Sequence, residues 1–374
     1  MHIKNTMRLL LILISMSQAK MEFATNNECQ SCHTEIYKEF SRSMHGNSAS
    51  FQDPIHEAVW DRHPKNKKVK KYVCGKCHTP AADNLSSMLL KGKAGTGVKA
   101  LPDAANPTHR EAISCSYCHR IDSVKHGKSA NKNVISKKEK HYFGTMKNSL
   151  KSGFHTVSST NKNFQNGNIC MGCHSHKVNK AGLNVCSTND KNELKGANCV
   201  SCHMPQVKGS VSTQRATQTH AFHAFPGAHN NQEMLAKYID IEILKNINTF
   251  VIAVNNKSPH EMLLHPLRLS QLHVVIIRNG EKIKMKPHNF VRIIGNNGEE
   301  TPPWIANTVV KNTMIHGYEK RLVKYKVKLV KGDKVMVHLG HFLVKPKALK
   351  KLGLDKTAVA RKFYTLKKQT FIIK

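Results

Sequence analysis

The chain has 374 residues, which is enough for two domains of ordinary size. It contains 59 Lys or Arg and 24 Asp or Glu, giving a formal net charge of +35, and its hydrophobic content of 39% is not that of a disordered chain. No stretch approaches the about 20 apolar residues of a bilayer span, which argues against a polytopic membrane protein.

The first residues have the pattern of an export signal. A basic segment up to Arg8 precedes an apolar run from Leu9 to Ser15, and small residues follow as far as Ala19. An apolar run this short does not span a bilayer, so the pattern predicts a signal peptide over residues 1–19 that is cleaved on export. An uncleaved anchor is the alternative. Export from a Gram-negative cell would make the protein periplasmic.

Ten of the 11 cysteines fall into five copies of one pattern, Cys-x-x-Cys-His. The cysteine pairs are Cys29 and Cys32, Cys74 and Cys77, Cys115 and Cys118, Cys170 and Cys173, and Cys199 and Cys202. The histidines that follow them are His33, His78, His119, His174 and His203. Their spacing is irregular, so the chain is not a repeat array. The pattern itself is the attachment signal for c-type haem.

The segment that carries the motifs is poor in apolar residues and rich in Lys, Asn, Ser and Gly. Five haems in roughly 200 residues leave about 40 residues for each, too few for an ordinary side-chain core. We therefore predict a mainly α-helical and loop domain over residues 20–234, with little regular structure, in which the porphyrins form the core.

The second half has a different pattern. Segments rich in β-branched residues are separated by turn signals such as Asn279-Gly280 and Asn297-Gly298. The expected strands are 248–255, 272–278, 321–330, 334–339 and 363–373, with one short helix over 346–354. Together these patterns predict an α + β protein whose second domain, residues 235–374, is an antiparallel β-sandwich-like structure.

The motif fits haem chemistry because positions i, i+3 and i+4 share one face of a helical turn. Each thiol can add to a haem vinyl group, and the histidine then provides the proximal iron ligand. Zinc sites and redox disulfides also use Cys-x-x-Cys pairs. A histidine directly after every second cysteine favours five covalent haems c over both alternatives.

The sixth iron ligand separates two kinds of function. A second histidine closes the iron and suits electron transfer, whereas an open position allows a substrate to bind. The chain has 24 histidines, so the supply of second ligands is ample.

Several segments resemble multihaem cytochromes of the cytochrome c-554 type. The first motif is followed by Tyr37, Phe40 and Ser43-Met44-His45-Gly46; Ile113–Ile121 is similar to the family's middle motif, and Asn198–Pro205 with His223–Gly227 to its last. The second half, from Asn255 through Pro259-His260 and Pro266-Leu267-Arg268, looks like the β-rich tail often appended to such cytochromes. The resemblance implies the same haem domain and an electron-transfer role.

The resemblance also implies distal iron ligands. It points to His45, His155 and His223, and after them to His109 and His260. In the family a Gly-His pair is common where this chain has Pro259-His260. His220 competes with His223, and His176 is a reserve.

Two functions follow from these motifs. The first is an electron carrier, because the motifs are crowded and no other catalytic constellation is evident. The second is a haem oxidoreductase acting on nitrite, hydroxylamine or sulfite at one five-coordinate haem. All five motifs end in His, whereas the lysine-ended variant is usual at the catalytic haem of pentahaem nitrite reductases; we therefore favour the carrier.

The charge indicates the partners. Residues 241–374 hold 26 Lys or Arg and eight Asp or Glu, hence 26 − 8 = +18. In an exported protein such a field favours acidic redox partners or an anionic membrane surface rather than nucleic acid. The alternative is that the lysines merely solvate the surface. The remaining cysteine, Cys186, is either a free thiol or an alternative link to the last haem in place of Cys199.

Overall fold

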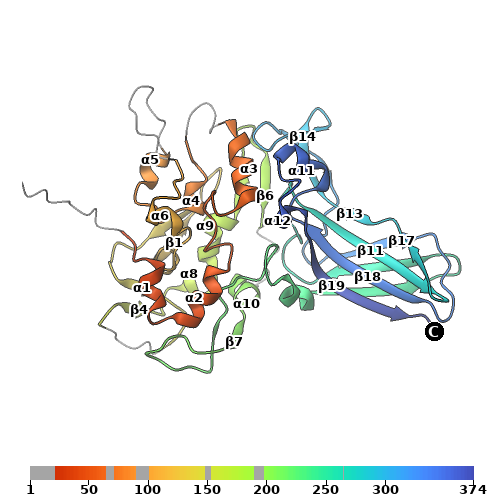
Figure 1. Ribbon diagram of the computed structural model, residues 1–374, viewed down its shortest axis with the longest axis horizontal. Helices are drawn as coiled ribbons and strands as arrows, with labels where there is room; N and C mark the ends of the chain where they lie inside the picture. Colours follow the sequence, from red (N-terminus) through yellow and green to blue (C-terminus); the bar gives the residue numbers. More distant parts are fainter. Residues whose placement is uncertain (1–21, 65–70, 90–100, 148–152, 189–197, 264) are drawn as a thin grey trace, which may run out of the picture.

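The computed structural model describes residues 22–64, 71–89, 101–147, 153–188, 198–263 and 265–374. The predicted export signal over residues 1–19 lies outside these residues. The fold is mixed: short helices and small sheets make up the first part of the chain, and long antiparallel strands the second (Figure 1). Within the described residues, no helix has the length and apolar composition needed to span a bilayer.

The helices of the first part are short, and several of them are capped by local polar side chains. They are α1 (Asn26–Gln30), α2 (Thr34–Ser41), α3 (Pro54–Arg62), α4 (Gly75–His78), α5 (Leu85–Leu89), α6 (Pro107–Arg110), α7 (Cys115–His119), α8 (Lys162–Gln165), α9 (Met171–His174) and α10 (Cys199–His203), with the 3₁₀ helices η2 (Asn168–Cys170) and η3 (Gln232–Tyr238). Thr25 and Glu28 form a capping box on α1, and the Asp53 side chain accepts the Ile55 N–H at the start of α3.

Four two-stranded sheets also lie in this part, which makes the prediction of a mainly helical domain incomplete. Strands β1 (Ile121–Lys125) and β2 (Lys132–Ile135), β5 (His176–Val178) and β6 (Asn184–Ser187), and β7 (Gln206–Lys208) and β8 (Thr219–Ala221) pair antiparallel, whereas β3 (His141–Phe143) and β4 (Thr156–Ser158) pair parallel. These strands are short and polar, so their sequences lack the alternation of apolar and polar residues that would predict them.

Only some of the strands of the second part match the predicted segments. One sheet has the order β17 (Lys320–Tyr325), β10 (Phe250–Asn256), β9 (Ile239–Lys245). A larger sheet has the order β12 (Glu281–Lys284), β11 (Leu269–Arg278), β18 (Lys334–Phe342), β19 (Phe363–Ile372), with β13 (His288–Phe290) also on β11. A third joins β15 (Glu299–Glu300), β14 (Arg292–Asn296) and β16 (Thr308–Asn312). Strands β10, β11, β17, β18 and β19 correspond to the predicted segments, whereas β9 and β12 to β16 were not predicted. The helices are α11 (Pro346–Leu352) and α12 (Ala358–Arg361).

The turn between β11 and β12 has the conformation that the Asn279-Gly280 pair predicts. Asn279 and Gly280 have φ values of 50° and 83°, the left-handed conformation that a two-residue hairpin turn requires. Strand β17, by contrast, ends at Tyr325 instead of continuing to Val330 as predicted.

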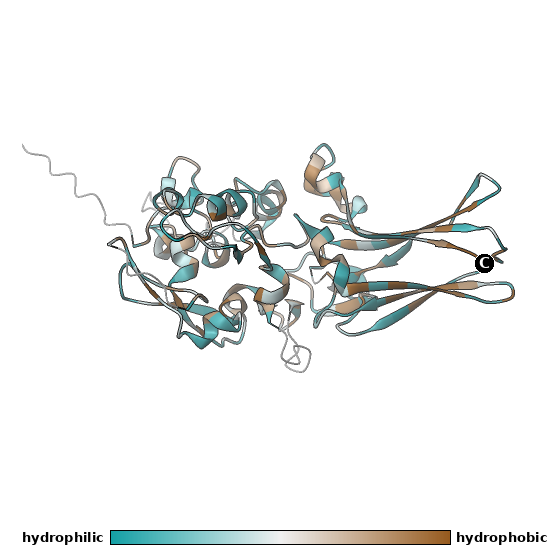
Figure 2. Ribbon diagram, turned by 90° about the horizontal axis from the view of Figure 1, so that it is seen from below, coloured by the Kyte–Doolittle hydropathy of each residue, from teal (hydrophilic) through white to brown (hydrophobic). Residues whose placement is uncertain are grey.

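One apolar cluster joins the two larger sheets. It includes Phe250 and Ile252 of β10, Ile276 of β11, and Val335 and Leu339 of β18, all of them fully buried. Figure 2 shows the long strands in two layers, with hydrophobic residues along the strands of both. Burying one such side chain contributes about 1.5–3 kcal/mol, so this cluster is the main side-chain core of the molecule.

A second cluster joins the first part of the chain to the last. Ile55 and Ala58 of α3 pack against residues around α11 and α12, namely Leu343, Val344, Leu354, Ala360 and Tyr364. The Arg62 Nε–H donates to the Lys351 carbonyl oxygen at 3.0 Å. The two halves of the chain therefore share a packed junction at α3 (Figure 1).

Candidate haem sites

All five motifs lie on helical turns, as the sequence predicts. Four of them coincide with α4, α7, α9 and α10, while the first spans the end of α1 and the start of α2. The His33 N–H donates to the Cys29 carbonyl at 2.9 Å, and the His78 N–H to the Cys74 carbonyl at 3.0 Å. One α-turn thus brings both thiols and the imidazole of a motif to the same face.

Cysteines of different motifs lie in contact with one another. The thiols of Cys29 and Cys115 are hydrogen-bonded, as are those of Cys77 and Cys173, and of Cys170 and Cys199. These contacts are not disulfides, since all 11 cysteines are free. The contact with Cys173 lowers the pKa of Cys77 to about 6, and that with Cys170 lowers the pKa of Cys199 to about 7. The first motif therefore adjoins the third, the second the fourth, and the fourth the fifth.

Three motif histidines face a second histidine in a nearly parallel arrangement. The ring centroids of His33 and His155 are 6.2 Å apart with an interplanar angle of 25°. His119 and His223 are 6.3 Å apart at 19°, and His203 and His260 are 6.2 Å apart at 20°.

These separations fit two imidazoles on opposite sides of one metal atom. A metal–imidazole bond is about 2.0–2.1 Å, and the nitrogen lies about 1.1 Å from the ring centre, so the two centroids would be about 6.3 Å apart. The residues of these three pairs therefore fit a haem iron with two histidine ligands.

Hydrogen bonds at Nδ1 fix the tautomer of these rings. Nδ1 of His33, His119 and His203 lies 2.7 Å from the carbonyl oxygens of Val211, Phe143 and Pro226, respectively. Nδ1 of His223 and of His260 contacts carbonyls in the same way, at 2.6 and 2.8 Å. A carbonyl only accepts, so Nδ1 must donate. Nε2 then keeps its lone pair and can bind a metal.

The histidine of the fourth motif faces His45. The ring centroids of His45 and His174 are 5.9 Å apart and the rings are tilted by 58°, while Phe225 packs edge-on against His45 at 4.2 Å. Burial lowers the pKa of His45 to about 3 and that of His174 to about 4. Both rings are therefore neutral at neutral pH, which is the form that binds metals.

The second motif differs from the other four. Its His78 faces His56 of α3 at a centroid distance of only 4.0 Å, too short for a metal atom between the rings. Both Nδ1 atoms lie near the same carbonyl oxygen, that of Ser48, at 3.1 and 3.3 Å. The His56 Nε2 contacts the Tyr72 hydroxyl at 3.4 Å. The sequence analysis did not find His56, which lies in no motif and follows only a helix-start signal, Asp53-Pro54.

His109, which the resemblance offers as a distal ligand, has hydrogen-bond partners at both ring nitrogens. Its Nδ1 accepts the Asp103 N–H at 2.9 Å, so Nε2 carries the proton and donates to the Asn84 Oδ1 at 2.8 Å. This is the opposite tautomer to that of the facing pairs, and both nitrogens are already engaged. The ring is fully buried and serves as a hydrogen-bonding element of the loop before α7.

The two alternative histidines also have other partners. The His220 Nε2 lies 2.9 Å from the Glu39 Oε1, so His223 rather than His220 faces His119. The His176 Nε2 lies 2.8 Å from the Gly127 carbonyl oxygen. His155, which the sequence placed only as upstream of the fourth motif, faces the first motif instead.

Cys186 lies in β6, opposite Lys177 of β5. Burial raises the pKa of its thiol, which keeps the sulfur protonated and unreactive at neutral pH. The other candidate linking residue, Cys199, contacts Cys170.

Comparison with known proteins agrees with this geometry. A family model described as "Cytochrome c554 and c-prime" matches residues 28–120 and 114–204. Among solved structures, the penta-heme cytochrome c552 from Thermochromatium tepidum is similar over 94% of this chain and 100% of its own, with a TM-score of 0.72 and 20% sequence identity. A sequence comparison with curated proteins finds no relative.

The fold, the motifs and the facing histidines define a multihaem c-type cytochrome with a haem-based electron-transfer or redox function. Residues 28–204, from the first motif to the end of the fifth, match the cytochrome c554 family.

Proposed function

We propose that this chain is an exported electron carrier that holds five covalent haems c and serves a respiratory chain. When bound, the haems supply one-electron iron chemistry. The ten motif cysteines attach them, and the five motif histidines are the proximal ligands. The observation that carries the proposal is the set of facing histidines, because an iron closed by two imidazoles suits electron transfer rather than substrate binding.

In this proposal His155, His45, His223 and His260 are the distal ligands opposite His33, His174, His119 and His203. The hydrogen bonds at Nδ1 orient His223 and His260 and hold the ligating tautomer, and burial lowers the pKa of His45 and of His223 to about 3, which keeps those two rings neutral. The residues themselves thus prepare the positions before any iron is bound.

The contacts between motifs support a connected path for electrons. The first motif adjoins the third through Cys29 and Cys115, and the fourth adjoins both the second and the fifth. Cys118 of the third motif is close enough to Cys170 and Cys173 to raise the pKa of both thiols. We propose the order first, third, fourth, with branches from the fourth to the second and to the fifth.

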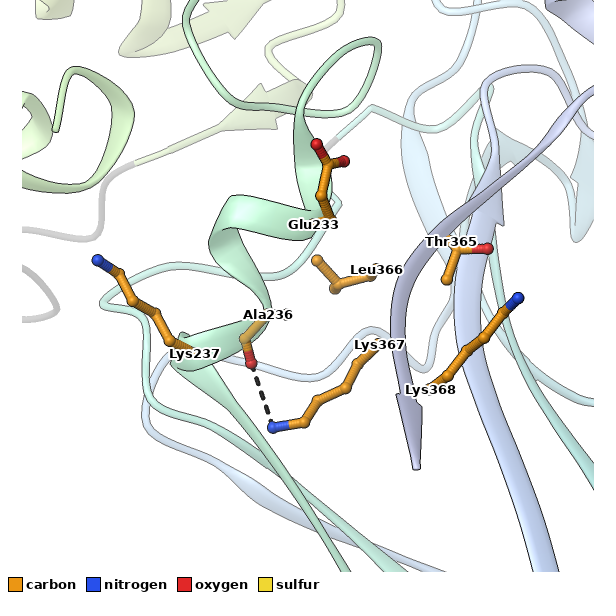
Figure 3. Close-up of a pocket in the computed structure, with 7 residues that line it drawn as sticks. All are labelled: Glu233, Ala236, Lys237, Thr365, Leu366, Lys367 and Lys368. Atoms are coloured by element: carbon orange, nitrogen blue, oxygen red, sulfur yellow. Dashed lines mark hydrogen bonds between the residues drawn. The ribbon is translucent and has the colours of Figure 1, made fainter. Parts of the chain in front are cut away.

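The end of the path at the fifth motif lies beside a basic groove that we propose as the docking site of an acidic redox partner. Tyr238 of η3 contacts Cys202, which raises the pKa of the phenol to about 12. The neighbouring Lys237 lines a groove of about 490 Å³ together with Lys367 and Lys368 of β19 (Figure 3). The Lys367 ammonium donates to the Ala236 carbonyl oxygen at 3.2 Å, which holds η3 against the strand.

We further propose that residues 20–234 are the haem domain and residues 235–374 a β-sandwich-like domain, with residues 1–19 as a cleaved signal peptide and the periplasm as the compartment. The apolar cluster shared by the two larger sheets supports the sandwich. The family's covalent haem chemistry supports export, since c-type haem is attached outside the cytoplasm.

One observation favours a second function, that of an oxidoreductase for a small nitrogen or sulfur species. The centroid distance of 4.0 Å between His78 and His56 leaves no space for iron with both rings as ligands. An iron bound by His78 alone would have an open position for nitrite, hydroxylamine or sulfite.

Carbon monoxide binding to the fully reduced holoprotein tests the two functions. A carrier whose five irons are closed binds no CO, whereas one CO per chain, together with turnover of one of the three substrates, would establish the oxidoreductase. Redox-poised EPR on the same sample reports the spin state of each haem. Protein whose mass lacks five haem additions would contradict both functions.

A further inference from the structure

A group of basic side chains lies at the junction of the two halves, next to the second motif. Arg268 directly precedes β11, and its neighbour Leu267 packs into the same cluster as Ile55 and Ala58 of α3. Ala228, which precedes His229, belongs to that cluster as well. Helix α3 also carries His56, which faces His78 of the second motif. Arg268 and His229 therefore lie near the second motif, whose facing histidine is too close to leave room for a metal atom between the rings.

Within the described residues Arg268 forms no ion pair, although the Asp53 carboxylate lies near enough to raise its pKa. Its polar side-chain contact in the described part of the chain is a 3.5 Å approach of Nη2 to the His229 Nε2. A guanidinium has five N–H donors and keeps its charge at neutral pH. Burial lowers the pKa of Arg268 from its ordinary value, which reports how much solvent the charge has lost. Arg268 is half-buried, and a guanidinium that has lost part of its water is stabilised by an anion beside it.

The two neighbouring histidines add donors to the same place. The His229 Nδ1 is buried and, among the described residues, has no hydrogen-bond partner. The His265 Nδ1 accepts the Leu267 N–H at 3.2 Å, so its Nε2 carries a proton that can be donated. Burial and the nearby Arg268 lower the pKa of both histidines to about 3, so both are neutral donors at neutral pH.

The other charged groups of the junction are already engaged. Asp53 caps α3 through the Ile55 N–H at 2.9 Å. Lys345 is paired with Glu300 at 2.6 Å, and the His341 Nε2 lies 2.8 Å from the Ala228 carbonyl oxygen. Among the described residues, what remains is a guanidinium without an ion pair, with two imidazoles beside it and the Asp53 carboxylate nearby, an arrangement that can take a further anion.

We propose that Arg268, His229 and His265 form an anion site at this junction, beside the Cys74–His78 motif, that takes a carboxylate or a small oxyanion. The anion has two possible sources: a propionate of the haem held by the second motif, or a free oxyanion such as nitrite or sulfite. The inference rests on the proposed attachment of a haem at Cys74 and Cys77. It gives the β-rich half of the chain a role, which is to supply the positive charge at a haem of the other half.

The test compares the holoprotein with Arg268→Gln, with Arg268→Lys, and with Arg361→Gln as a matched control, since Arg361 is exposed on α12. Mass spectrometry first counts the haems in each variant. Midpoint potentials are then measured by potentiometric titration, and nitrite and sulfite are titrated separately against the visible and EPR spectra.

The two sources give different results. If a propionate is the anion, Arg268→Gln lowers the midpoint potential of one haem, because a positive charge near the iron has been removed; Arg268→Lys lowers it less, and Arg361→Gln leaves it unchanged. If a free oxyanion is the ligand, nitrite or sulfite changes the wild-type spectrum, and Arg268→Gln weakens that binding at least tenfold without altering the potentials measured in its absence.

An Arg268→Gln holoprotein with five haems, wild-type potentials and a wild-type response to both oxyanions overturns the proposal. If that variant does not accumulate, His265→Gln decides instead: the proposal requires a change in the same direction, and unchanged potentials and oxyanion binding reject it. Loss of the haem at Cys74 and Cys77 from the wild-type protein would appear in the mass, and would contradict the proposed function rather than the anion site.

Discussion

Two buried histidines near Glu39 allow a sharp test of the facing pairs, because only one of them faces a motif histidine. His223 faces His119 at 6.3 Å, whereas the His220 Nε2 lies 2.9 Å from the Glu39 Oε1. The Glu39 Oε2 also accepts the His223 N–H at 2.8 Å, so one carboxylate positions both segments. Replacing His223 by Ala removes the imidazole opposite His119 and leaves the rest of this network in place.

The expected size of the effect follows from the number of motifs. His223→Ala should convert one of the five haems to high spin, which removes about one fifth of the low-spin EPR intensity and creates one CO site per chain. His220→Ala should leave the spin states unchanged, but should lower the free energy of unfolding by about 1–3 kcal/mol, because a buried carboxylate loses its partner. EPR and CO titration of the two variants measure both effects. A fully low-spin His223→Ala protein, or a high-spin haem in His220→Ala, would refute the assignment.

Three further predictions concern stability and association. Burial lowers the pKa of His341 to about 4, below its unfolded value of 6.5, so the unfolded chain binds a proton first as the pH falls. Between pH 6.5 and 4 this group therefore lowers the free energy of unfolding by about 3 kcal/mol at most. In His341→Gln the free energy of unfolding should fall less steeply over this pH range, as acid titration would show. Phe250→Ala removes a fully buried ring stacked on Tyr325 and should cost about 3–5 kcal/mol in chemical denaturation; a loss below about 1 kcal/mol would contradict the shared core. Lys237→Glu should slow electron exchange with an acidic partner and weaken its dependence on ionic strength in stopped-flow measurements, whereas Lys350→Glu on α11 should not; equal effects would reject the groove as the docking site.

The sequence by itself determined the local structure of the motifs. A Cys-x-x-Cys-His segment needs only one helical turn to bring its three side chains to one face, and that geometry depends on neighbouring residues alone. Five strands of the second half were also predictable, because β-branched residues and turns such as Asn279-Gly280 carry their own conformational preference, whereas β9 and β12 to β16 were not predicted. The short strands between the motifs were missed because they are polar and span only three to five residues, although each pairs with a neighbouring strand along the chain.

Only the tertiary structure decided which histidines face one another. His155 faces His33, and His45 faces His174, although in each case the two residues lie far apart in the chain. The resemblance offers both His223 and, after it, His109; in the folded chain Asn84 and Asp103 occupy both nitrogens of His109, whereas the Ala221 carbonyl contacts only Nδ1 of His223. The physical reason is that a metal ligand needs a particular tautomer, direction and distance. All three are fixed by groups that reach the ring only after the chain has folded.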